Sequence, residues 1–398
     1  MRKLSLDVID FSLHREYFAK PIREVLKDLA NKSKQQNVRL PFSFDKADVD
    51  CRDVRTYLGM IAKFLVAHPH VPMSVGNILR LIEKDEKFRM KHGWPLLRDK
   101  NPTDSAESRK KACPDEYHCM KLLAELFDYG KFSRGEGWLY ESETMTLRSC
   151  DIKAESSDEK GWDAYRFIDA VREVNKLTYC PYCNAEPVYS LFMPGEEPDR
   201  ARSDLDHFMP KWLFPYLAIS PSNLVPACAR CNAKMKGSDL PLVFDRKGRP
   251  SLAMAHPYLN DVHRHSQFAF EKVTSRLFNG RATKGQLALS CTCHQTKEGR
   301  LAEASVRRFC LLKVYQEIYT RELREAPVRI RIGRSSYLQF LTDYLNRHVT
   351  SASIQVKPIS SGRFRRLVLN CSLNEDRIPD ERLAKLMIDI DRQLNPLC

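Results

Sequence analysis

Cys180-Pro-Tyr-Cys183 and Cys228-Ala-Arg-Cys231 are the two stretches that decide how the middle of this chain folds. In each stretch two residues separate the cysteines, so a tight turn can bring both sulfurs to one tetrahedral metal ion. A single CxxC is also consistent with a redox motif or with chance, but two such pairs favour structural zinc. Four thiolates leave zinc no open position for water, so we expect the ion to stabilise the fold and to take no part in catalysis.

Three further motifs lie between or directly after these cysteine pairs. They read Ser203-Asp-Leu-Asp-His-Phe-Met-Pro210, Ser222-Asn-Leu-Val-Pro226 and Cys231-Asn-Ala-Lys-Met-Lys-Gly237. Neighbouring residues of a strand point to opposite faces, so Asp206 and His207 can serve one site only where their strand ends or twists. We therefore expect a strand terminus at this pair. Gly237 is typical of a helix end, which predicts that Asn232 lies on a short helix ending at Lys236.

These motifs resemble the HNH endonuclease family. Its ββα-metal fold places an Asp-His pair on the first strand, an Asn on the second strand, and an Asn or His on the helix. The resemblance implies these places for Asp206 and His207, for Asn223, and for Asn232. It also implies that Asn223 shapes the loop or orients His207 and does not bind metal. The resemblance covers residues 180–240, and His256-Pro-Tyr-Leu259 looks like a segment that follows this core in some bacterial HNH proteins.

The chemistry of these residue types agrees with the resemblance. Hydrolysis of a phosphodiester needs a water that has lost a proton, and the pKa of imidazole suits His207 to act as general base. A hard divalent cation, Mg2+ or Mn2+, prefers oxygen ligands, which Asp206 and the side-chain carbonyl of Asn232 can supply. The cation would neutralise the phosphate and stabilise the leaving oxyanion.

Basic residues are concentrated around the same motifs. Lys and Arg outnumber Asp and Glu between residues 200 and 249. We expect phosphate contacts from Lys211, Arg230, Lys234 and Lys236, because backbone phosphates are bound mainly by such side chains.

The phrases Phe208-Met-Pro-Lys-Trp and Ser220-Pro-Ser-Asn-Leu-Val-Pro226 are similar to nuclease subunits of bacterial anti-phage systems of the Septu type. In that group the nuclease accompanies an ATPase subunit. The resemblance implies that this chain is the nuclease of such a defence system and that it cleaves nucleic acid, with DNA favoured over RNA as the substrate. It also implies an ATPase partner. The chain has no GxxxxGK[ST] motif, so ATP hydrolysis would belong to the other subunit.

Two alternatives from other functional classes stay open. The chain could be a non-catalytic zinc module that binds nucleic acid, or an ATPase-docking subunit in which the nuclease fold is a relic. The cluster Cys291-Thr-Cys293-His294, and Cys113 with His118 and Cys119, could ligate a second metal, although buried free cysteine is the more usual interpretation.

The whole chain has the composition of a globular protein. Its 398 residues are 43% hydrophobic and 29% charged, and the net charge of +14 would attract a polyanion. We expect an α+β fold, mainly α-helical, with a ββα-metal core that the four-cysteine zinc site stabilises. The predicted regions are a helical part at 1–160, which would bind a partner or the target, the nuclease domain at 161–260, and a mixed part at 261–398.

Apolar spacing predicts the individual elements outside the motifs. A helical period joins Ile22, Val25, Leu26 and Leu29, and helices are also expected at 162–175, 298–325 and 380–394. Residues 101–111 are expected to form a surface loop, 328–332 a strand, and 353–373 a hairpin. Asp7 and Asp10 interrupt any signal peptide, and thirteen cysteines without one suggest a reducing compartment, so we expect a cytoplasmic protein without membrane contact.

Overall fold

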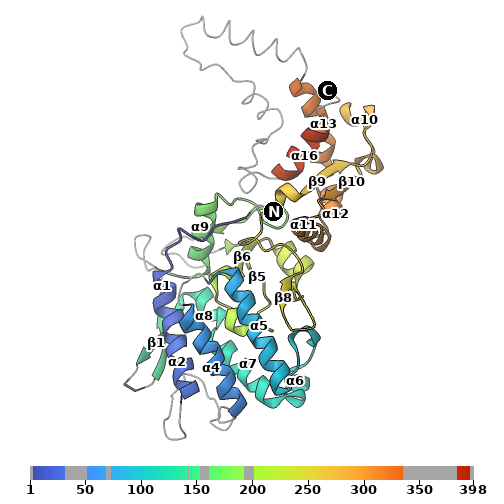
Figure 1. Ribbon diagram of the computed structural model, residues 1–398. Helices are drawn as coiled ribbons and strands as arrows, with labels where there is room; N and C mark the ends of the chain where they lie inside the picture. Colours follow the sequence, from blue (N-terminus) through green and yellow to red (C-terminus); the bar gives the residue numbers. More distant parts are fainter. Residues whose placement is uncertain are drawn as a thin grey trace, which may run out of the picture. The chain divides into compact units, whose positions relative to one another are not determined.

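The computed structural model of the protein is mixed α+β, and its strands form short antiparallel pairs (Figure 1). The structure describes residues 3–31, 52–68, 73–141, 143–144, 146–152, 161–191, 201–334 and 383–394. The chain divides into two compact units. The N-terminal unit comprises Leu4–Asn175 and Val188–Leu259; the C-terminal unit comprises Met1–Lys3, Lys176–Pro187 and Asn260–Cys398. The three-region division expected from the sequence stays a prediction.

Helices make up most of the first part of the N-terminal unit. They are α1 (Ser12–His14), the π-type η1 (Arg15–Ala19), α2 (Lys20–Asn31), α4 (Arg52–Ala67), α5 (Val75–His92), the 3-10 turn η2 (Leu97–Asp99), α6 (Ala106–Ala112), α7 (Pro114–Leu126), α8 (Tyr129–Arg134) and α9 (Ala164–Asn175).

Helices α2 and α4 pack against each other, and α2 does so with the apolar face that the sequence predicted. On α2, Ile22, Val25 and Leu26 are at most 1% exposed. On α4, Val54 and Leu58 are equally buried. Residues spaced three and four apart share one helix face, so each helix buries one apolar stripe and leaves its charges in water. The described residues of the first 160 are mainly helical, although an antiparallel strand pair within 136–151 departs from the predicted pattern. The helix predicted at 162–175 is confirmed as α9.

The described residues of the N-terminal unit also form four strand pairs and three short helical turns. The pairs are β1 (Glu136–Glu141) with β2 (Thr146–Asp151), β3 (Ser190–Leu191) with β4 (Ala201–Arg202), β5 (Asp204–His207) with β6 (Leu224–Ala227), and β7 (Leu242–Phe244) with β8 (Pro250–Leu252). The turns are the 3-10 turns η3 (Pro215–Leu217) and η4 (Pro221–Asn223) and the π-type helix η5 (Arg230–Lys236).

Among its described residues, the C-terminal unit combines one strand pair with helices. It contains the 3-10 turns η6 (His263–His265) and η7 (Lys284–Leu287), the pair β9 (Ser266–Phe270) and β10 (Leu289–Cys293), and helices α10 (Ser275–Phe278), α11 (Lys297–Arg308), α12 (Leu311–Ile318), α13 (Thr320–Arg334) and α16 (Ala384–Leu394). Helix α16 packs on β9: Asp389 accepts a hydrogen bond from the main-chain N–H of Phe268 at 2.9 Å. The mixed character expected for this part is therefore present.

Some expectations for single elements were wrong. Residues 328–332 belong to helix α13 and not to a strand, because a two-residue alternation over five positions is too short to override a helix already running from Thr320. Helix α6 begins within the predicted loop at 101–111, where the Ser105 hydroxyl caps it by accepting from Ser108 N–H. The long helix at 298–325 is three helices, with Cys310 between α11 and α12 in the left-handed region at φ 49°.

The hairpin expected at 353–373 lies outside the described residues, whereas the closing helix is present as α16. None of the helices in the described part of the chain has both the length and the apolar character that crossing a lipid bilayer demands.

Candidate functional site

Strands β5 and β6 bring two of the sequence motifs together. They pair antiparallel, with Asp204 opposite Ala227 and His207 opposite Leu224. Strand β5 ends at His207, as the sequence predicted. The chain then passes through η3 and η4 to β6, and η5 follows closely, with Gly237 ending it at φ 57°. A left-handed conformation at this position favours glycine, which agrees with the predicted helix stop.

Asp206 and Lys236 form a buried ion pair between β5 and η5. The Lys236 ammonium donates to Asp206 Oδ1 at 3.0 Å and to the main-chain carbonyl of His207 at 2.8 Å. The two residues are 1% and 2% exposed. Lys236 therefore lies under the strand, where it neutralises Asp206 and fixes the end of β5. The phosphate contact expected of Lys236 stays a prediction, and so does metal binding by Asp206.

Asn232 contacts a carboxylate that the sequence interpretation did not select. Its side-chain Nδ2 donates to Asp204 Oδ2 at 3.0 Å. Asp204 and Asp206 are two residues apart on a strand and share one face, just as Asn232 and Lys236 are four apart on one helix face. This face of β5 thus presents two carboxylates to η5. The two-residue period was a signal that could have identified Asp204.

The His207 ring has a different set of neighbours. Its Nε2 lies 2.8 Å from the main-chain carbonyl of Ala218, and its ring meets that of Tyr129 edge to face at 4.6 Å between centroids. Burial and then the charge of Lys211 lower the pKa of His207 to about 3. The imidazole is therefore neutral at pH 7. Because a carbonyl can only accept, Nε2 carries the proton and Nδ1 holds the free electron pair.

Tyr129 is a second residue that the sequence interpretation missed. It begins helix α8, far from the motifs along the chain, and no spacing rule connects it with His207. Lys211 Nζ lies 5.0 Å from the centroid of the Tyr129 ring, so the lysine and the imidazole both contact this ring.

Asn223 holds the segment between the two strands. Its Oδ1 accepts from the main-chain N–H of Met209 at 2.6 Å, and its Nδ2 donates to the carbonyls of Met209 and Leu217 at 3.0 and 3.1 Å. The side chain is fully buried. All of these partners are main-chain groups of the 208–218 segment, which also supplies the Ala218 carbonyl to His207.

The segment His256–Leu259 packs beside the same strands. The centroids of the His256 and Phe208 rings lie 4.1 Å apart, and Tyr258 OH donates to the Leu224 carbonyl at 2.8 Å. Both side chains are buried, and burial lowers the pKa of His256 to about 3. His256 is therefore neutral and supports the strand pair from within the core.

Of the four basic residues singled out from the sequence, Lys211 and Lys234 are exposed, Arg230 is half-buried, and Lys236 is the buried partner of Asp206. An exposed ammonium can meet a phosphate without losing an existing buried partner. Lys211 and Lys234 therefore have the environment that phosphate contact requires.

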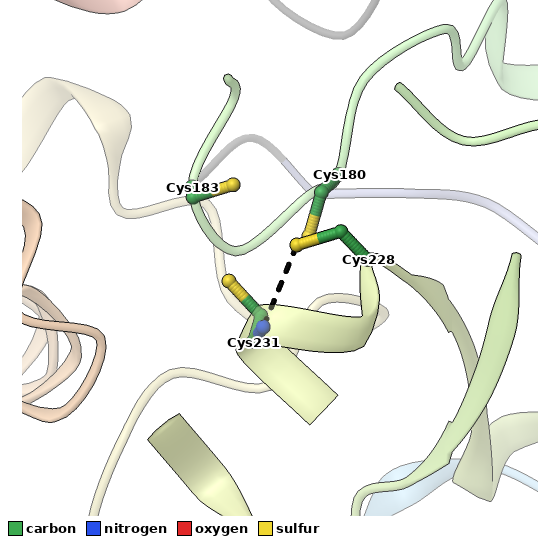
Figure 2. A group of neighbouring side chains, drawn as sticks. All are labelled: Cys180, Cys183, Cys228 and Cys231. Atoms are coloured by element: carbon green, nitrogen blue, oxygen red, sulfur yellow. Dashed lines mark hydrogen bonds between the residues drawn. The ribbon is translucent and has the colours of Figure 1, made fainter. Parts of the chain in front are cut away.

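The four predicted cysteines form one cluster. Their sulfur atoms all lie within 4.8 Å of one another, and Figure 2 shows the side chains of Cys180, Cys183, Cys228 and Cys231 turned toward a common point. All four residues are buried. The cluster could therefore hold a metal ion such as zinc.

The local geometry of each pair suits that ion. The Cys180–Cys183 turn is closed by a hydrogen bond of 2.7 Å from Asn184 N–H to the Cys180 carbonyl, and the Cys231 N–H donates to Cys228 Sγ at 3.5 Å. Main-chain N–H groups that point at sulfur stabilise thiolates, and zinc–sulfur bonds of about 2.3 Å place tetrahedral sulfurs about 3.8 Å apart. The donor set thus fits a four-coordinate structural metal.

The other cysteine clusters differ from this one. Cys291 Sγ and Cys293 Sγ lie 3.9 Å apart on β10, and burial raises the pKa of Cys291 to about 12, which keeps its thiol protonated. Within the described part of the chain, neither this pair nor Cys113, His118 and Cys119 belongs to a group of three or more closely placed metal ligands.

Comparisons of the chain with protein-family models, with curated proteins and with solved structures gave no match.

Proposed function

We propose that this protein is a metal-dependent HNH endonuclease that hydrolyses phosphodiester bonds of nucleic acid. The observation that carries the proposal is the arrangement of β5, β6 and η5. An antiparallel strand pair and a short helix bring together an acidic strand face, a neutral histidine at the strand end and an asparagine on the helix. Binding alone gives no reason for this combination, whereas hydrolysis uses each part.

In this proposal His207 acts as the general base. Its Nε2 proton is engaged by the Ala218 carbonyl, which orients the ring and leaves Nδ1 to accept a proton from water. The low pKa keeps Nδ1 unprotonated at neutral pH. The same low pKa makes His207 a weak base in the free protein, and an approaching phosphate would raise its pKa, since a nearby anion favours the protonated ring.

A hard divalent cation, Mg2+ or Mn2+, would occupy the face between β5 and η5. Asp204 and Asn232 already lie side by side and offer a carboxylate and an amide oxygen, once the Asn232 amide turns its oxygen toward the cation. Asp206 can join them only if Lys236 leaves it. Such an ion supplies charge neutralisation at the phosphate and at the leaving oxygen.

The cysteine cluster has a separate role in the proposal. It would hold zinc with four thiolates and would fix the start of η5, which carries Asn232 one residue after Cys231. The similarity to Septu-type nuclease subunits is the ground for the further proposal that the chain acts in anti-phage defence with an ATPase partner.

The experiment that tests the proposal is incubation of the purified full chain with plasmid DNA, linear DNA and RNA while Mg2+ or Mn2+ is varied. We expect cleavage that depends on the added ion, and a loss of at least about 100-fold in His207→Ala, the size of effect that removal of a general base has. Cleavage by His207→Ala at the wild-type rate would contradict the assignment. Binding of nucleic acid without cleavage under any ion would favour the non-catalytic zinc module.

A further inference from the structure

A cavity of about 270 Å3 lies beside the candidate site in the N-terminal unit. Helix α6, helix α7 and the segment just after β5 form its walls. It shares Lys211 with the surroundings of His207, because the Lys211 ammonium also lies over the Tyr129 ring that touches the imidazole. Lys211 thus connects the cavity with the surroundings of His207.

The lining is strongly basic. Lys100, Arg109, Lys121 and Lys211 contribute to it, against the single lining carboxylate of Glu116, while Lys121 also lies 4.0 Å from Glu125 outside the lining. That carboxylate is buried and already holds the cations of Arg89 and Lys100. The cavity therefore attracts an anion, and phosphate is the anion that such clustered cations usually bind.

Arg109 is the most direct indication of a missing ligand. Its Nε is buried and has no hydrogen-bond partner among the residues that the structure describes. A buried donor without a partner is unfavourable, and a phosphate toward which the half-buried Arg109 side chain turns would supply the hydrogen-bond acceptor.

The remaining walls suit a flat, partly apolar group. Tyr117, Trp212 and Met120 line the cavity, and the Trp212 indole is fixed by a hydrogen bond of 3.0 Å from Nε1 to the Ser238 carbonyl. Unpaired bases stack on such aromatic side chains, whereas bases within a duplex stack on one another and are not available. The volume is near the lower end for small-ligand sites, about 300 Å3, so it suits one nucleotide and not a base pair.

We propose that this cavity binds an unpaired nucleotide of the substrate strand next to the bond that is cut, so that the protein acts on nucleic acid with a single-stranded segment. The inference rests on the proposed nuclease function and names its substrate class. Arg109 and Lys121 would hold the phosphate of this nucleotide, and Tyr117 and Trp212 would contact its base.

The test measures binding by fluorescence anisotropy with the full chain carrying His207→Ala, so that no probe is cut. The probes are a labelled single strand, a blunt duplex of the same sequence, and the free mononucleotide as competitor. In this background Arg109→Ala is compared with Lys110→Ala, which removes the same charge from the same helix at an exposed residue outside the cavity. Circular dichroism verifies that both variants fold.

We expect the single strand to bind more tightly than the duplex, and Arg109→Ala to weaken its binding about tenfold while Lys110→Ala changes it by no more than about twofold. A further variant, Tyr117→Leu, should weaken binding of the single strand and leave that of the duplex unchanged. Equal effects of Arg109→Ala and Lys110→Ala would overturn the inference. So would equal binding of both probes, or a free mononucleotide that binds as tightly as the strand.

A parallel cleavage assay separates this inference from the proposed function. If the chain with His207 intact cuts nucleic acid and Arg109→Ala behaves like Lys110→Ala, only the nucleotide site is wrong. If nothing is cut under any divalent ion while binding still prefers the single strand and depends on Arg109, the nuclease proposal is wrong and the nucleotide site stands.

Discussion

Asp204 and Asp206 show how two like residues two positions apart acquire different surroundings. Asp206 forms a buried ion pair with the ammonium of Lys236, whereas Asp204 is only half-buried and accepts a hydrogen bond from Asn232. A carboxylate that already has a buried cation gains less from a metal ion than one that has only an amide donor.

This difference leads to a prediction for the two carboxylates. We expect Asp204→Asn to raise the Mn2+ concentration needed for half-maximal cleavage at least about tenfold, because one charged oxygen ligand is lost. The measurement is the cleavage rate as a function of Mn2+ concentration. Asp206→Asn is the matched variant, and we expect it to lower the free energy of unfolding by about 3 kcal/mol, since it leaves Lys236 buried without its partner charge. If Asp204→Asn leaves the required Mn2+ concentration unchanged and Asp206→Asn raises it, the metal ligand is Asp206 and not Asp204.

The residues that were predictable from the sequence are those whose signal is local. The two cysteine pairs and Gly237 after η5 follow from spacing rules that hold over a few residues. Tyr129 and Arg109 could not be found in this way. Their importance depends on helices α8 and α6 lying beside a strand that comes much later in the chain.

At the scale of elements, the short helix η5 connects the cysteine cluster to the candidate site. Cys231 and Asn232 are adjacent on it, so the sulfur that would bind zinc and the amide that contacts Asp204 share one turn of helix. The sequence predicted this helix and its end from Gly237. It did not predict that η5 would have a π-type hydrogen-bond pattern, which places Gly237 N–H on the Asn232 carbonyl at 2.8 Å.

Loss of one cysteine ligand should therefore disturb η5 first. We expect Cys231→Ser to lose the bound zinc and to unfold at a lower temperature than the wild type, because binding of structural zinc is coupled to folding. Zinc content by elemental analysis and the unfolding midpoint by circular dichroism are the measurements. Cys310→Ser, at an exposed position outside the cluster, is the control and should keep both values. A full zinc content in Cys231→Ser would contradict the four-cysteine assignment.

For the other helices and strands, the length of the apolar repeat decided whether the sequence could predict them. Helices α2 and α4 have apolar stripes long enough to identify. Residues 328–332 alternate over only five positions, and the neighbouring helical sequence determined their conformation. Helix α6 has no buried residue to give it a period, and only the cap at Ser105 could have indicated it.

Across the whole molecule, the buried His14 and His256 and the half-buried His207 make folding sensitive to acid. Burial lowers the pKa of His14, His207 and His256 to about 3 in each case. Between pH 6.5 and 3 these residues are protonated in the unfolded chain but neutral in the folded protein. Protons therefore favour the unfolded state, and the stability present above pH 6.5 is lost as the pH falls through this window.

His14 allows this effect to be measured away from the candidate site. Its Nδ1 accepts a hydrogen bond of 3.1 Å from the Trp162 indole. We expect the wild type to lose about 2 kcal/mol on account of His14 between pH 7 and pH 5, and His14→Gln, which cannot be protonated, to lose correspondingly less. Urea unfolding at both pH values provides the comparison. An equal pH-dependent loss in the two proteins would show that His14 does not titrate as its burial implies.

The proposal as a whole depends on His207 removing a proton from water, and chemical rescue tests that step most directly. The measurement is the single-turnover cleavage rate of His207→Gly with and without added imidazole, at a zinc content equal to that of the wild type. We predict a loss of at least about 100-fold and partial recovery when imidazole occupies the space left by the side chain. A cleavage rate in His207→Gly that equals the wild-type rate without imidazole would contradict the account.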